Sequence, residues 1–341
     1  MRPPTSDDAI VVSVIGAGVV GGRTVRHLVS GLTAGRVMIH DIRRDAANAT
    51  ARASGARAVV GELDQALDAP IVVVVTPSPQ LEIATEALGR GAHVVTTTDE
   101  LDDVNRLMQL EPRARAAGRT VVLCANLAPG LAGLLARMLA DRLDDADEIH
   151  VAVHGTAGPA CARQHHRALG GIGLGWHDGG WIERQAGSGR ELCWFPEPVG
   201  PQDCYRSEMV DPYVLHALFP EVQRISARMS ATRRDRLTAR LPMLRSPHLE
   251  GTMGARRVEV RGSHRGGREA LVLGVAERPG TASAIVAGAT ALAVHQGMIA
   301  VSGVVALGDP RLPTELLVDR LRDGGIAVDE FVGTGATGST W

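Results

Sequence analysis

Three glycines near the start of the chain have the spacing needed to hold phosphate groups. They occur in the stretch GAGVVG, residues 16–21, which directly follows a run of β-branched apolar residues. In such a turn Gly16 permits a tight bend, Gly18 lets the backbone approach a pyrophosphate, and Gly21 lets a helix pack closely on a strand. The free N–H groups at the start of the following helix would bind the phosphates. The spacing therefore predicts a dinucleotide-binding turn.

An acidic residue downstream supports this prediction. Asp41 follows the second apolar run, where its carboxylate can accept hydrogen bonds from both ribose hydroxyls of an adenosine. Its charge would repel a 2′-phosphate, whereas Arg43 or Arg44 could pair with one. The expected cofactor is therefore NAD or NADP, with NAD favoured. We expect its contacts to come from Val19, Val20, Asp41 and Arg43 in addition to the glycines.

Small polar residues follow three later apolar runs. These residues are Thr76 with Pro77, then Thr98, then Asn126. In a doubly wound sheet the ligand lies beyond the carboxyl ends of the strands, at the point where the strand order reverses. We therefore expect Thr76, Pro77 and Thr98 to contact the nicotinamide end of the cofactor. We expect Asn126 to contact the substrate.

The first 130 residues alternate between strand-like and helix-like patterns. Strands that alternate with helices of about ten or more residues form a parallel sheet with crossover helices. The predicted fold is α/β, a Rossmann doubly wound parallel sheet followed by a second, α+β domain for substrate binding and dimerisation. Strands are predicted over residues 10–15, 36–40, 71–75, 93–97 and 120–123, with helices over 24–32, 80–88 and 101–117.

The remainder of the chain suggests where the domains divide. A loop enters an apolar helix near residue 131, and a strand of a new sheet follows over 148–153. Two paired strands are predicted over 257–262 and 271–276, and a helix of small residues over 280–294. The predicted division is a nucleotide-binding domain over 1–130, an α+β substrate domain over 131–278 and a C-terminal segment over 279–341.

This order of elements resembles the saccharopine dehydrogenase-like (saccharopine reductase-like) family. The resemblance rests on the PGL junction at 129–131, the paired strands, the helix that opens at Thr281-Ala282 and the later Gly303-Val304. It spans most of the chain and implies that the C-terminal segment returns to the nucleotide domain. It also implies hydride transfer at a carbon–nitrogen centre of an amino-acid-derived small molecule, an imine reduced to a secondary amine or the reverse.

Two other families with similar nucleotide domains fit less well, because the chain contains no lysine. The Gfo/Idh/MocA oxidoreductases carry an EKP-type motif where residues 97–100 here read TTDE. Dihydrodipicolinate reductases carry paired histidines followed by a lysine, and here His165 and His166 lack that lysine. Two other functions stay open: a dehydrogenase of a hydroxyl or aldehyde substrate on the same fold, and a regulator that binds NAD(P) without turnover.

The aromatic residues are concentrated in one part of the second half. Seven of the nine lie between positions 176 and 219, although aromatic residues make up only 3% of the chain. Aromatic side chains form rigid walls for ligands or anchors at interfaces. We therefore expect Trp176 and Trp194 to contact the substrate. The expected proton donors are His166, then His165, then Tyr205, because such side chains can donate a proton to a reacting group.

The overall composition excludes several classes of partner. A formal net charge of −2 argues against nucleic acid and membrane surfaces, and no apolar stretch reaches the roughly 18 residues that span a bilayer. The four cysteines are scattered and form no CxxC pair, which predicts reduced thiols in a cytoplasmic protein and no metal site. The expected partners are a small-molecule substrate and a second copy of the chain in a homodimer.

Overall fold

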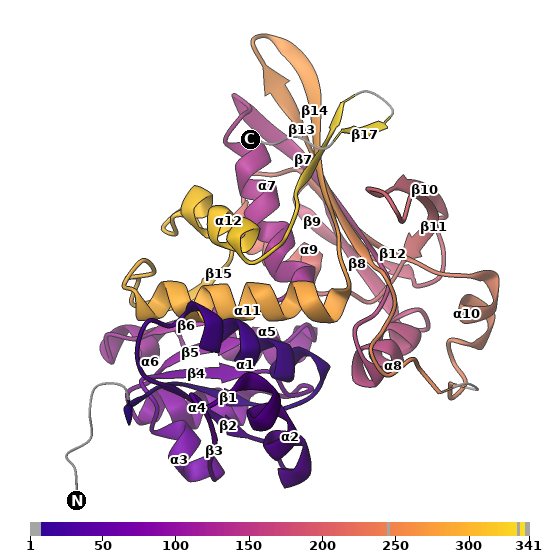
Figure 1. Cartoon of the computed structure of the whole chain (residues 1–341). Coiled ribbons are helices and arrows are strands. Elements are labelled where there is room, and N and C mark those ends of the chain that lie inside the picture. Colours follow the sequence, from indigo (N-terminus) through magenta and orange to yellow (C-terminus); the bar gives the residue numbers. More distant parts are fainter. Residues whose placement is uncertain (1–7, 244–245, 333–334, 338–341) are drawn as a thin grey trace, which may run out of the picture. The chain divides into compact units, whose positions relative to one another are not determined.

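The computed structural model describes residues 8–243, 246–332 and 335–337, which fold into two compact units (Figure 1). The first unit comprises residues 8–126, 283–307 and 311–324, and the second comprises residues 127–282, 308–310 and those from 325 onward. The chain therefore leaves the first unit at Asn126 and returns to it within a long helix near the C-terminus.

The first unit is built on a seven-stranded sheet with the order β15-β6-β5-β4-β1-β2-β3. All neighbouring strands in this sheet are parallel. The chain order reverses between β1 and β4, which is the switch point of a Rossmann doubly wound sheet. The predicted α/β class is thus confirmed. The strands are β1 (Ile10–Ile15), β2 (Arg36–His40), β3 (Ala58–Val60), β4 (Ile71–Val74), β5 (His93–Thr96), β6 (Thr120–Leu123) and β15 (Gly303–Ala306).

Helices lie on both faces of this sheet, with α1 and α11 on one face and α3 and α4 on the other (Figure 1). Every residue of β4 and β6 is buried, as expected for apolar strands covered on both sides. The helices are α1 (Val19–Gly31), α2 (Arg44–Ser54), α3 (Leu63–Leu67), α4 (Leu81–Gly89), α5 (Leu101–Met108), α6 (Glu111–Ala116), α11 (Pro279–His295) and α12 (Thr314–Asp323).

Two predicted helices differ from the observed ones. The helix predicted over 101–117 is two helices, α5 and α6, with Pro112 in the first turn of the second. Proline has no N–H to donate to the preceding turn, so one continuous helix cannot run through it. The helix predicted over 24–32 begins five residues earlier, at Val19, so that Gly21 and Gly22 lie within its first turn.

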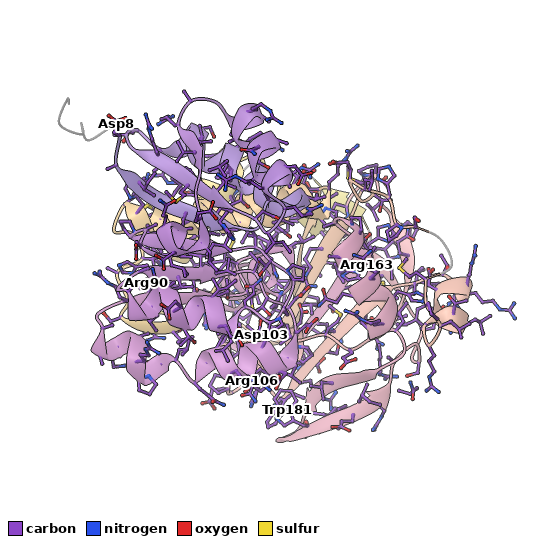
Figure 2. The ribbon with its side chains drawn as sticks, turned by 90° about the horizontal axis from the view of Figure 1, so that it is seen from below. Asp8, Arg90, Asp103, Arg106, Arg163 and Trp181 are labelled. Atoms are coloured by element: carbon purple, nitrogen blue, oxygen red, sulfur yellow. The ribbon has the colours of Figure 1, made fainter. Side chains whose placement is uncertain are left out.

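Arginines pair with acidic side chains across the surface of the first unit. Arg90, which is labelled in Figure 2, forms ion pairs with Asp64, Asp68 and Glu86, and these pairs join the end of α4 to α3. Pairs of this kind on an exposed surface each contribute about 0–1 kcal/mol. The stability of the unit therefore comes mainly from its buried strands and helices.

The second unit is built on a ten-stranded mixed sheet. Its main order is β10-β11-β12-β7-β13-β14-β16-β17, with the hairpin of β8 and β9 paired to β12. The strands are β7 (Asp145–His154), β8 (Ile172–His177), β9 (Gly180–Gln185), β10 (Glu191–Trp194), β11 (Pro201–Arg206), β12 (Arg224–Ser230), β13 (Ala255–His264), β14 (Gly267–Ala276), β16 (Asp329–Val332) and β17 (Gly335–Thr337). The helices are α7 (Ala132–Ala140), α8 (Pro159–Ala168), α9 (Asp211–Leu218) and α10 (Arg233–Thr238), with a π-helical turn at Leu127–Leu131.

The two faces of this sheet differ in chemistry. Helices α7 and α9 pack on the central strands, and Ile149, Val151 and Val258 are buried on that side. Alternate residues of the same strands point the other way, as strand geometry requires. Glu259 there accepts hydrogen bonds from arginines on its own strand. The polar residues of that second face include Glu148, His150, Ser226, Arg228, Arg257, Glu259 and Arg261.

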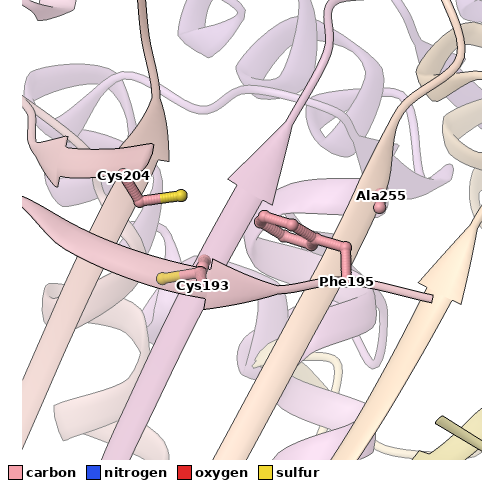
Figure 3. Packing of buried hydrophobic residues seen from close by; sticks show 5 residues of the cluster. Cys193, Phe195, Cys204 and Ala255 are labelled. Atoms are coloured by element: carbon pink, nitrogen blue, oxygen red, sulfur yellow. The ribbon is translucent and has the colours of Figure 1, made fainter. Parts of the chain in front are cut away.

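A small apolar cluster joins the β10 and β11 end of this sheet to its central strands β7 and β13. Cys193, Phe195 and Cys204 are buried there against Ala152 and Ala255 (Figure 3). The two alanines are small, so the Phe195 ring can lie close to the backbone of β7 and β13. All four cysteines of the chain are free thiols. In the described part of the chain, no helix is long and apolar enough to cross a bilayer.

Candidate functional site

The glycine turn connects β1 to α1 at the switch point of the sheet. Gly16 has a φ of 109°, and its N–H donates to the carbonyl of His40 at 2.8 Å. A Cβ at Gly16 would lie 2.9 Å from the carbonyl oxygen of Val75, and one at Gly21 would lie 1.9 Å from that of Gly16. Packing alone therefore requires glycine at both positions.

Gly18 is different, because nothing in the packing requires it. Its φ of −72° is accessible to any residue, and an added Cβ would meet no atom within 4 Å. Gly18 is also the N-cap of α1, which has no side-chain cap. The first helical hydrogen bond runs from the N–H of Gly22 to the carbonyl of Gly18, so the N–H groups of Val19 and Val20 precede it. This open helix start suits an approaching phosphate.

Asp41 lies at the same end of the sheet. Its Oδ2 accepts a hydrogen bond from the N–H of Ala17 at 2.6 Å, and its Oδ1 accepts one from the N–H of Arg43 at 2.8 Å. The carboxylate is thereby fixed between the glycine turn and the end of β2, with 10% of the side chain exposed. Arg44 forms an ion pair with Glu62, whereas the Arg43 side chain is largely exposed, with its Nε 3.7 Å from Oδ1 of Asp41.

The residues after β4 and β5 also lie together. The hydroxyl oxygens of Ser78 and Thr98 are 2.7 Å apart, which joins the two turns. The Thr76 hydroxyl is buried and makes no hydrogen bond to the described residues. Pro77 is exposed next to it. The structure thus gathers Thr76, Pro77 and Thr98 at the carboxyl edge of the sheet, where they were expected.

Asn126 joins the same group from the end of β6. Its Nδ2 donates to the carbonyl of Thr97 at 2.8 Å. Cys124, two residues earlier, has a φ of 56°, which is rare for a residue other than glycine. This conformation accompanies a tight bend in which the N–H of Asn126 donates to the carbonyl of Cys124 at 2.7 Å. The first unit therefore places the glycine turn, Asp41, Thr76, Thr98 and Asn126 at one end of its sheet.

Two buried residues at this end were not among the predicted site residues. Gln80 binds Thr76 and Thr97 through its side chain, and Asp103 accepts hydrogen bonds from the N–H groups of Gln80 and Leu81. The available signal was the position of Gln80, which directly follows the proline-rich turn after β4. Nothing in the sequence distinguishes Asp103 from the other acidic residues around it.

The three predicted proton donors lie on two elements of the second unit. His165 and His166 are adjacent on α8, and Nε2 of His166 is 3.1 Å from the carbonyl oxygen of Leu241. Tyr205 is buried on β11 with the guanidinium of Arg236 4.0 Å above its ring centre. Their roles remain predictions.

The predicted aromatic wall divides into two parts. Trp176 stacks on His216, with the ring centres 3.9 Å apart, and Trp181 and Tyr213 complete the cluster. Trp194 lies on β10 and is about half exposed. Burial lowers the pKa of His216, whose Nδ1 has no hydrogen-bond partner among the described residues. The sequence did not single out His216. No cluster of His, Cys, Asp or Glu that could hold a metal occurs in the described residues.

Comparison with known proteins establishes the fold. No protein-family model and no curated protein matches the sequence. The structure resembles the DAP dehydrogenase of C. glutamicum in complex with DAP, with a TM-score of 0.51 and 16% identity over 94% of this chain and 99% of that one. It also resembles an engineered D-amino acid dehydrogenase bound to NADP+, with a TM-score of 0.50 and 15% identity over 91% of this chain and 96% of that one. Both similarities cover more than nine-tenths of this chain.

Proposed function

We propose that this protein is an NAD(P)-dependent oxidoreductase that transfers a hydride to or from a carbon–nitrogen centre of an amino-acid-derived small molecule. The observation that carries the proposal is the open start of α1 at Gly18, with the carboxylate of Asp41 fixed beside the same turn. A helix N-terminus next to a ribose-binding acid at a switch point is what a dinucleotide requires. The fold shared with two solved dehydrogenases supports the same proposal.

The residues at the end of the first sheet fit such a cofactor. The N–H groups of Val19 and Val20 would bind the pyrophosphate, and the remaining acceptor capacity of Asp41 would bind the adenosine ribose. Thr76, whose hydroxyl has no hydrogen-bond partner among the described residues, and Thr98 would lie toward the nicotinamide. When bound, the nicotinamide supplies the hydride-transfer chemistry.

The carbon–nitrogen centre is supported by two structural neighbours. One structural neighbour is an engineered D-amino acid dehydrogenase and the other is a DAP dehydrogenase. The resemblance to the saccharopine dehydrogenase-like family stays a prediction, since no family model matches the chain. A screen of NADH consumption with 2-oxo acids plus amines, and separately with aldehydes and ketones, tests this assignment. Turnover only in the second set would make the protein a hydroxyl or aldehyde dehydrogenase. Cofactor binding without turnover in either set would make it a nucleotide-sensing regulator.

We expect the protein to bind NADH about tenfold more tightly than NADPH, a difference of about 1.4 kcal/mol. The reason is that Asp41 presents a negative charge where the 2′-phosphate would lie, while Arg44 is already paired with Glu62. Titration of the fluorescence of the four tryptophans with each nucleotide measures the two affinities. Asp41→Ser should reduce the preference, and Arg44→Gln should leave the NADH affinity unchanged. If NADPH bound more tightly than NADH, we would instead infer that Arg43 binds the 2′-phosphate of NADPH.

We also propose that the protein is a homodimer through the second unit and functions in the cytoplasm with its thiols reduced. Cys193 points into the sheet, so Leu192 and Trp194 on either side of it point outward, 54% and 49% exposed. Light scattering should give a mass of twice 35.9 kDa. Trp194→Glu should produce the monomer, whereas Leu237→Glu, at an exposed position on α10, should not. A monomeric wild type at micromolar concentration would contradict this proposal.

A further inference from the structure

The side chain of Gln80 joins the ends of two strands of the first sheet. Gln80 is fully buried and directly precedes α4. Its Nε2 donates to the carbonyl of Thr76 at 2.6 Å and to the hydroxyl of Thr97 at 3.2 Å. Its Oε1 accepts a hydrogen bond from the N–H of Thr97 at 3.0 Å. One amide group therefore fixes the residues that follow β4 and β5.

The backbone of Gln80 is itself held from α5. Oδ2 of Asp103 accepts a hydrogen bond from the N–H of Gln80 at 2.8 Å, and Oδ1 accepts one from the N–H of Leu81 at 3.2 Å. Both N–H groups belong to the start of α4 and have no partner within the helix. Asp103 is labelled in Figure 2 and is buried. Since the backbone is fixed, the side-chain amide has a defined position and direction.

Strand pairing does not require this buried amide. Backbone hydrogen bonds already pair β4 with β5 from Ile71 to Val74, before the chain reaches Thr76. A buried amide costs free energy unless all its groups are bonded, so an apolar residue of the same shape would serve packing as well. The N–H and the hydroxyl of Thr97 also donate to the carbonyl of Val74, at 3.2 and 3.0 Å. What Gln80 adds to these bonds is a direct link from Thr97 to Thr76, beyond the strand ends.

These two threonines lie on the side of the switch point toward which the cofactor would extend. Gly16 touches Val75, so the glycine turn lies directly against the end of β4. We propose that Gln80 is a positioning residue, which holds Thr76 and Thr97 at the separation that receives the nicotinamide end of the dinucleotide. This inference rests on the proposed function. It assigns to Gln80 the part of the affinity that comes from the nicotinamide rather than from the adenosine and pyrophosphate.

Calorimetric titration of the full chain with NADH and with ADP-ribose tests the assignment. ADP-ribose contains the adenosine, both riboses and the pyrophosphate, but it lacks the nicotinamide. Gln80→Leu should weaken NADH binding about tenfold and ADP-ribose binding by less than about twofold, where tenfold corresponds to about 1.4 kcal/mol. A variant that only lost stability would lose affinity for NADH and for ADP-ribose by the same factor.

Two further variants complete the experiment. Thr120→Val removes a buried hydrogen bond to the carbonyl of Val301 at the opposite end of β6, and both affinities should stay unchanged. Gln80→Glu keeps the acceptor for the N–H of Thr97 but loses both bonds donated by Nε2, and it answers the question if Gln80→Leu does not fold. If the Gln80 variant bound both ligands equally more weakly, or bound both as the wild type does, the role of Gln80 would be wrong and the proposed function would stand. A wild type that binds neither ligand would overturn the proposed function and this inference with it.

Discussion

Gly18→Ala should weaken NADH binding by at least about tenfold while leaving the melting temperature of the protein nearly unchanged. The backbone of Gly18 has a φ of −72°, and the added methyl group would meet no atom within 4 Å in the described residues beyond its own neighbours in the chain and helix. The methyl group would instead occupy the space through which the pyrophosphate approaches the start of α1. Calorimetric titration together with a thermal melt of the same sample measures both quantities.

Gly21→Ala is the matched control for this prediction. The same methyl group at Gly21 would lie 1.9 Å from the carbonyl oxygen of Gly16, so the turn or the helix must move. We expect a clear drop in melting temperature, because overpacking a buried contact costs about 1–3 kcal/mol or more. If Gly18→Ala lowered the melting temperature as much as Gly21→Ala does, the argument that Gly18 is reserved for a ligand would be wrong.

Asp211→Ala should destabilise the second unit by about 3–5 kcal/mol, since it leaves an arginine charge buried without its partner. Arg256 on β13 is completely buried and pairs with Asp211 in the first turn of α9. The bond to Asp211 is donated by Nη2, and Nε and Nη1 of Arg256 have no hydrogen-bond partner among the described residues. Urea unfolding followed by circular dichroism should show the midpoint of the second unit moving to a lower concentration.

Asp211→Ala can lose stability because the Arg256 charge stays buried without its partner, or because the ion pair itself is lost. The double variant Asp211→Leu with Arg256→Met distinguishes these two causes. Apolar residues of similar size often replace a buried ion pair at no cost, because neither charge has to leave water. We therefore expect the double variant to recover most of the stability that Asp211→Ala loses. If the double variant were less stable than Asp211→Ala, the ion pair would stabilise the fold by more than the neutralisation of one buried charge by the other.

The first sheet was predictable because its signals are local. A run such as Ile71–Val74 is buried on both faces and reads as a strand without any knowledge of its neighbours. The glycine turn and Asp41 were equally accessible, since the chemistry of a dinucleotide site is confined to a short stretch of chain. Strand β3 has only three residues and helix α3 only five, so neither produces a periodic pattern.

The buried polar contacts were not predictable because each depends on residues far apart in the sequence. Gln80 meets Thr97 and Asp103 only after β4, β5 and α5 have packed. Arg256 and Asp211 are separated by 45 positions, and each alone resembles a surface charge. The aromatic concentration was visible, but its division between a cluster around Trp176 and the exposed Trp194 follows from the sheet order.

The last strand of the first sheet, β15, is synthesised long after the other six strands. It pairs with β6 along Gly303–Ala306, and the Thr120 hydroxyl bonds to Val301, 181 residues later. The ribosome must therefore synthesise residues 127–282, most of the second unit, before β15 can complete the first sheet. Until then the edge of β6 is open to pairing with other chains. A truncated gene that encodes only residues 1–126 should yield aggregates, whereas one that fuses 283–324 to that segment restores the missing edge.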